Sequence, residues 1–283
     1  MRPLIAWLGA RFIYVLIWIF GRTHRRDEVA WLMGPLGNEV IGDAPYEEVA
    51  TREGLAIERD AKGVGLVPRF TQLSGEGFVI SDVDPKIRDF YEHTADYTMD
   101  VWSRTYFPAN LGLALLVTTI SRQVNQLNFP LSPLETALGM KSEVIALRSP
   151  DGEVKYTGWF RTLPSANDRA IYTGFYMTVM VPGEVAPCVK VVFPMPNGNA
   201  TVMLRPRAID GALELDSGGG RFGGAGFYRV QARGPDSVRV WNIRTLKEHF
   251  RVFVDGQGTL RCDHSVHFLG LPVLKLHYKM ARA

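Results

Sequence analysis

The stretch HFRVFVDGQGTLRCDHSVHF, residues 249–268, decides the fold. Asp255-Gly256 divides it, and this residue pair tolerates the positive φ that tight hairpins require. Side chains of a strand point alternately to its two faces, so the second half has one largely apolar face and one polar face. The apolar face carries Leu260, Cys262, His264, Val266 and Phe268, and the polar face carries Thr259, Arg261, Asp263, Ser265 and His267. This pattern predicts a β-hairpin with one face turned toward a core or a cavity.

Similar segments fill the rest of the chain beyond residue 133. Each is short, has strand-like composition and is bounded by Pro, Gly, Asn or Asp. Asn197-Gly198 is a second strong turn signal. About eleven strands with no helix between them predict a β meander over residues 138–281, curved or closed so that its edges are hidden. The fold class is therefore α+β, mainly antiparallel β. The expected strands are 140–147, 153–161, 169–180, 188–193, 201–205, 212–215, 227–232, 237–243, 249–254, 259–268 and 273–280.

Two helices are expected to flank the meander, in a helical layer over about residues 84–127. Asp84 can cap a helix that begins at Pro85, and apolar residues then recur at three- and four-residue spacing up to Phe107-Pro108. The second helix is predicted over residues 109–126. Its apolar run, 111–117, is too short to span a bilayer, and we interpret it as a buried helix under the β layer. A membrane-docking helix is the alternative.

The amino-terminal segment LIAWLGARFIYVLIWIF, residues 4–20, predicts a membrane-associated helix. Its length is marginal for a membrane span, so a spanning and an interfacial position both stay open, and a core helix of the soluble domain is the third possibility. The basic residues Arg22, Arg25 and Arg26 follow it and suit anionic head groups. By the positive-inside rule they place the main domain on the cytoplasmic side. We therefore divide the chain into an anchor and basic flank, residues 1–26, and a single β-rich domain, residues 27–283.

Composition excludes several classes of protein. The 283 residues carry a formal net charge of only +3, which is too small and too evenly spread to neutralise several phosphates, so nucleic-acid binding is not expected. The basic surplus belongs to the residues before Asp27, the first acidic residue. Cys188 and Cys262 lie far apart, which excludes a structural zinc site, and in the cytoplasm both would be reduced thiols. The sequence contains no nucleophile elbow, zincin motif, Walker loop or dinucleotide fingerprint. It identifies no cofactor.

His264 is the histidine expected to point inward. Burial among apolar neighbours would favour its neutral form and make it usable as a base. The alternative is a core histidine that is hydrogen-bonded to a backbone carbonyl group. Lys190 is expected to be an exposed residue of its strand.

Acidic residues form a stripe on the helix predicted after Pro85. The side chains of Asp89, His93, Asp96 and Asp100 recur at spacings of four, three and four, so they share one helix face. Such a stripe could bind a divalent metal, or His93 and Asp96 could act as an acid/base pair. A solvated face opposite the apolar stripe explains the same residues without a function.

These observations predict a membrane-anchored protein whose β-rich domain encloses an apolar small molecule or a lipid. If the chain is an enzyme, a cofactor-free isomerisation or cyclisation that uses His264 and a carboxylate is the simplest reaction. The alternative is an accessory, non-catalytic subunit of a larger membrane complex, held by its helix and by partner membrane subunits.

Overall fold

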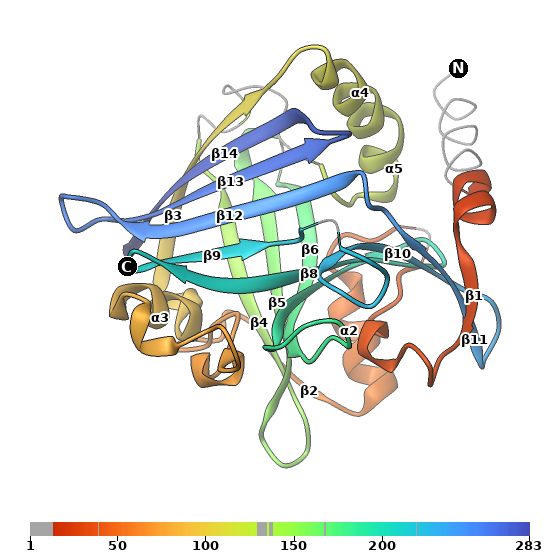
Figure 1. Ribbon diagram of the computed structural model, residues 1–283, viewed down its shortest axis with the longest axis horizontal. Helices are drawn as coiled ribbons and strands as arrows, with labels where there is room; N and C mark the ends of the chain where they lie inside the picture. Colours follow the sequence, from red (N-terminus) through yellow and green to blue (C-terminus); the bar gives the residue numbers. More distant parts are fainter. Residues whose placement is uncertain (1–13, 39, 129–134, 136–137, 167, 219) are drawn as a thin grey trace.

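Antiparallel strands make up most of the molecule (Figure 1). The structure is a computed structural model and describes residues 14–38, 40–128, 135, 138–166, 168–218 and 220–283. Every strand predicted between residues 138 and 281 is present, and three earlier strands are added. The strands are β1 (Arg22–Arg25), β2 (Ala56–Glu58), β3 (Tyr97–Thr105), β4 (Lys141–Arg148), β5 (Val154–Leu163), β6 (Arg169–Val179), β7 (Cys188–Met195), β8 (Gly198–Ile209), β9 (Ala212–Asp216), β10 (Gly226–Ala232), β11 (Ser237–Asn242), β12 (Leu246–Val254), β13 (Leu260–Phe268) and β14 (Leu271–Arg282).

The strands form one sheet with the order β2-β4-β5-β6-β7-β8-β9-β12-β13-β14-β3. A side branch leaves this path where β10 pairs with the first part of β8, β11 pairs with β10, and β1 pairs with β11. The second part of β8 pairs with β9, so this long strand belongs to both branches. The sheet bends until β12–β14 cross in front of β4–β6 (Figure 1). It stays open, because β2 and β3 end the path without pairing to each other, so the predicted meander is curved but not closed.

The gap between β4 and the helix that precedes β3 is bridged by residues 61–67, which we call the strap. The Ala61 amide donates to the Val144 carbonyl on β4, and the Val67 amide donates to the Tyr91 carbonyl. Gly65 lies where the strap touches this helix, since a Cβ there would be 2.0 Å from the Tyr91 carbonyl oxygen. Only a glycine fits this close approach. The amides of Gly63 and Leu66 and the carbonyl of Val64 add further hydrogen bonds to the segment before β3. The strap therefore joins this segment to β4 without a ladder of strand pairs.

The helices are residues 14–20, α2 (Ala44–Glu53), α3 (Pro85–Glu92), α4 (Ala109–Leu116) and α5 (Arg122–Val124). The α3 helix begins as predicted, with the Asp84 side chain accepting a hydrogen bond from the Lys86 amide. The prediction that it continues to Phe107 is wrong, because residues 97–105 form β3 and pair with β14. Met99 and Val101 are buried and are two residues apart, as in a strand with one buried face. The same segment also fits helical spacing, which led to the wrong prediction. The helical layer is thus split by a strand.

The second predicted helix is present as α4, a π turn (Val117–Ser121) and α5. The expectation that its apolar run, 111–117, lies buried is wrong for residues 111–116, because α4 has no buried residue; Val117, in the π turn, is buried. Its side chains Leu111 and Leu115 are 63% and 62% exposed. The α4 helix lies over one end of the sheet (Figure 1).

Both hairpin signals mark real turns, but neither places positive φ on both residues of the predicted pair. Between β12 and β13 it falls on Gly258, while Asp255 accepts hydrogen bonds from the amides of Gln257 and Thr259. Between β7 and β8 it falls on Asn197, and Gly198 is already paired with Met195. The side chain of Asp255 therefore organises a longer loop than a two-residue turn.

The amino-terminal prediction lies partly outside the described residues, which begin at Tyr14. Residues 14–20 are helical, and the carbonyl groups of Ile17 and Trp18 accept hydrogen bonds from the Arg239 side chain on β11. Phe20 stacks on Trp241 of the same strand. The basic flank after this helix forms β1, so it is part of the sheet. Its Arg25 pairs with Asp27 at 2.8 Å.

Candidate functional site

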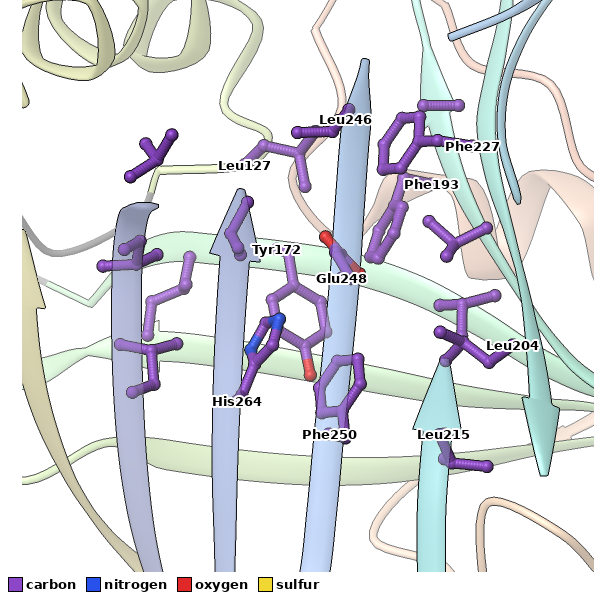
Figure 2. A pocket seen from close by; sticks show the side chains of 18 of the residues that line it. Leu127, Tyr172, Phe193, Leu204, Leu215, Phe227, Leu246, Glu248, Phe250 and His264 are labelled. Carbon is purple, nitrogen blue, oxygen red and sulfur yellow. The ribbon is translucent and has the colours of Figure 1, made fainter. Parts of the chain in front are cut away.

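The bent sheet encloses a cavity of about 820 Å³ (Figure 2). Inward-facing side chains of β12, β13 and β14 line one wall, and those of β5, β6, β7 and β8 line the opposite wall. Nearly all of them are apolar or aromatic. Arg161, Arg229, Glu248 and His264 are the charged or titratable exceptions besides tyrosine and cysteine. A volume of this size accommodates a drug-sized molecule or a lipid chain.

The alternation predicted for β13 is confirmed. Cys262, His264 and Val266 line the cavity, whereas Asp263, Ser265 and His267 line a shallow polar hollow on the outer face. On this outer face the Asp263 carboxylate contacts Nδ1 of His277 at 2.6 Å. The cavity wall and the polar outer surface are thus two faces of the same strand.

His264 lies in the cavity wall and is 6% exposed. Its ring stacks on Phe250, with 3.8 Å between the ring centroids, and its Nε2 has no hydrogen-bond partner among the described residues. Burial, with contributions from the positive charge of Arg161 and from His249, lowers the pKa of His264 to about 3. The imidazole is therefore neutral at physiological pH, as expected. A base with so low a pKa takes a proton poorly, so hydrogen bonding suits this group better than proton abstraction.

Arg161 is the charged group that the sequence analysis missed. It is 3% exposed, and its guanidinium lies 3.6 Å from the centroid of the Trp159 ring. It also lies over the rings of Tyr172 and Tyr278 at 5.4 and 5.3 Å. Its Nη2 is 3.1 Å from the sulfur of Met99, whereas its Nε has no partner. Tyrosines are its electrostatic neighbours, and no carboxylate of the described residues forms an ion pair with it.

Glu248 is the acidic group of the cavity. Figure 2 shows its carboxylate directed into the cavity near Tyr172. Its backbone is paired with Ser217, but its carboxylate has no hydrogen bond or ion pair with any described residue. Burial raises the pKa of Glu248 to about 7, so the group exchanges a proton near neutral pH.

Both missed residues carried a signal in the sequence. Arg161 alternates with Trp159 and Leu163, and Glu248 alternates with Leu246 and Phe250. A charged residue on an otherwise apolar strand face points into the core or the cavity. The same alternation that identified His264 would therefore have found them.

The acidic stripe is divided among α3, the short 3-10 helix Thr94–Asp96 and β3. Asp89 accepts hydrogen bonds from the Tyr97 hydroxyl and from Arg282 at 3.0 Å, and its carboxylate lies 3.1 Å from Nδ1 of His93. Asp96 accepts from the Gly63 amide of the strap. Asp100 is exposed on β3, so the single helix face expected for all four residues does not exist. The described residues include no group of three or more His, Cys, Asp or Glu side chains arranged to hold a metal ion.

Lys190 lies on the face of β7 that is turned away from the cavity, and the expectation that it is exposed is wrong. It is 2% exposed and donates hydrogen bonds to the carbonyl groups of Trp31 and Met33. Burial lowers its pKa to about 7. Residues 31–34 cover this face of the sheet, which the pattern of β7 alone does not reveal.

Exposed apolar side chains surround one end of the cavity, which we call the mouth. They come from α4 and the loop before it, from the β13–β14 hairpin and from residues 14–20, and each of these segments also contributes residues to the cavity lining. We call these exposed side chains the apolar rim: Val15, Trp18, Ile19, Phe20, Phe107, Leu111, Leu115, Leu116, Phe268, Leu269 and Leu271. An apolar rim continuous with an apolar cavity marks an interaction surface.

Comparison with known proteins gives no relative. No family model, no curated protein and no solved structure matches the chain. The site must therefore be interpreted from its own geometry. No helix within the described part of the chain combines the length and the apolar character needed to cross a bilayer.

Proposed function

We propose that this chain binds an apolar small molecule or a lipid in the cavity of its bent sheet, at the surface of a membrane. The observation that carries the proposal is the 820 Å³ cavity with its almost entirely apolar lining. Water molecules find few hydrogen-bond partners in such a cavity, whereas an apolar ligand is stabilised there by burying its surface.

The cavity can be tested with N-phenyl-1-naphthylamine, a neutral apolar probe whose fluorescence rises in apolar surroundings. We expect saturable binding to the wild-type chain at one site. Ala200→Phe adds a ring to the cavity wall and should weaken binding of the probe about tenfold or more, because the ring occupies space that the probe needs. Ala281→Phe makes the same change at an exposed position of β14 and should leave binding unchanged. A wild-type chain that shows no saturable binding would contradict the proposal.

The apolar rim supports the membrane part of the proposal. Its side chains come from segments that are distant in sequence, yet they surround the same mouth. Burying exposed leucines in the interfacial region of a bilayer releases roughly 1.5–3 kcal/mol for each side chain that is fully buried. A mouth resting on the bilayer would let a lipid-soluble ligand enter without crossing water.

The orientation predicts a site-specific response to vesicles. Both native cysteines are buried, so a polarity-sensitive fluorophore can be attached selectively to Leu115→Cys on the apolar rim or to Val79→Cys, an exposed position that does not line the cavity. On adding phosphatidylcholine vesicles, the Leu115→Cys label should shift its emission to the blue, because it enters the lipid. The Val79→Cys label should not respond.

Equal responses at the two positions, or none at Leu115→Cys, would overturn the proposed orientation. The second result is the one expected of an accessory subunit whose apolar rim is covered by protein, since protein-free vesicles offer it no partner.

A further inference from the structure

The cavity contains a buried positive charge that the protein does not neutralise. The guanidinium of Arg161 is surrounded by Trp159, Tyr172 and Tyr278, and the described residues supply no carboxylate to it. Arg229, the other arginine of the cavity lining, differs in this respect, because it donates to the backbone carbonyl groups of Asn199, Val230 and Pro196. Arg161 keeps an unpaired Nε–H.

An arginine in this state favours an anionic ligand. Aromatic faces compensate part of the cost of burying the charge, but an ionised partner with hydrogen bonds compensates it better. Attraction between opposite charges is also stronger in a dry cavity than in water. The planar guanidinium is shaped for two parallel hydrogen bonds to a carboxylate.

The groups around Arg161 suit the oxygen atoms of such an anion. Burial raises the pKa of Tyr172 and of Tyr278 above the ordinary value for tyrosine, so both hydroxyls keep their protons and can donate. The neutral imidazole of His264 has an unpaired Nε2 in the same cavity. Two orphaned polar atoms, one on each wall, therefore border the same space.

The position of these groups gives the ligand a direction. On β13, Phe268 belongs to the apolar rim, whereas Cys262 is paired with Tyr278, the ring beside Arg161. Phe268 and Cys262 are six residues apart on this strand, so the mouth and the level of Arg161 are separated by about 20 Å. The wall between them carries Val266 and His264, with Glu248 opposite Val266 on β12. An anionic group at Arg161 thus leaves room for a long apolar chain that runs to the mouth.

We propose that the ligand of this cavity is a long-chain carboxylic acid, with its carboxylate on Arg161 and its chain directed toward the apolar rim. The proposal rests on the proposed function and adds the chemical class of the ligand. One carboxylate balances the single charge of Arg161. No covalent step is involved.

The test is competition against N-phenyl-1-naphthylamine by hexadecanoate and by hexadecanol, which share a chain and differ in the head group. The wild-type chain should bind hexadecanoate about 10- to 100-fold more tightly than hexadecanol, because the acid gains charge-assisted hydrogen bonds. Arg161→Met replaces the guanidinium with an apolar group of similar length. It should remove this preference, so that the variant binds hexadecanoate and hexadecanol with affinities within about twofold of each other. Arg161→Lys keeps the charge and should retain part of the preference.

The outcomes separate the two proposals. Equal affinities for acid and alcohol in the wild-type chain, with saturable probe binding, would overturn the carboxylic acid and leave the apolar cavity intact. Tighter binding of hexadecyl phosphate than of hexadecanoate would also overturn it, in favour of a phosphorylated lipid. If the probe itself does not bind, the proposed function fails.

Discussion

The free energy of unfolding of the wild-type chain should rise by about 3 kcal/mol between about pH 7 and pH 9.5, and Lys190→Met should abolish this rise. Lys190 is buried, and its folded-state pKa is lowered from 10.5 to about 7. Between these values the unfolded chain holds a proton on this lysine that the folded chain does not. Stability therefore rises with pH by about 1.4 kcal/mol per pH unit across this window, and the gain is lost again as the pH falls to 7.

Urea denaturation of the two chains at several pH values measures this difference. Methionine leaves the carbonyl groups of Trp31 and Met33 without their donor, so the variant is expected to be the less stable chain at high pH. The diagnostic quantity is the pH dependence of the difference between the two chains. Lys279→Met, at an exposed lysine of β14, is the matched control and should show no such change. Parallel curves for wild type and Lys190→Met would refute the prediction.

Glu248→Gln should stabilise the unliganded protein by about 3 kcal/mol at pH 8 and by almost nothing at pH 4. Burial raises the folded-state pKa of this carboxyl from 4.5 to about 7. Between these values the folded chain holds a proton that the unfolded chain has lost, so wild-type stability falls as the pH rises through the window. Above pH 7 the carboxyl is ionised in the cavity, which is costly without a partner. The amide has no such charge.

The measurement is again unfolding by urea, here at pH 4, 6 and 8 without ligand. Glu76→Gln changes an exposed glutamate and serves as the control. Equal stabilities of wild type and Glu248→Gln at pH 8 would show that the carboxylate is solvated in the cavity. They would also remove the basis for a proton-exchanging group beside the ligand.

The sheet was largely predictable from the sequence, because alternation is a local property. The hairpin of β12 and β13 and the inward position of His264 both follow from it. Residues 97–105 were misassigned because Thr94, Thr98 and Val101 satisfy helical spacing, while Met99 and Val101 satisfy strand spacing. Pairing with β14, at the far end of the chain, decides between them. Such long-range pairing is not visible in a local window.

The sequence predicts which side chains of a strand line the cavity, but not which side chains lie opposite them. The apolar faces around Arg161 and Glu248 show that both residues point inward, but not whether each finds a partner there. That depends on which strands the bent sheet places opposite one another. The exposure of α4 is a similar case, because its apolar run resembles that of a core helix, and only the arrangement of the mouth leaves it outside.

The strap, and not a pair of hydrogen-bonded strands, closes the circumference of the cavity. In a closed barrel, the number of strands and their stagger fix the circumference, and widening it breaks a ladder of hydrogen bonds. Here β2 and β3 are unpaired to each other, and the strap joins β4 to the segment before β3. Its bonds run to Val144 on one side and to Tyr91, Thr94, Ala95 and Asp96 on the other. Parting these ends would break the bonds of this short segment while every strand keeps its neighbours, so we expect any change in the width of the cavity to begin at the strap.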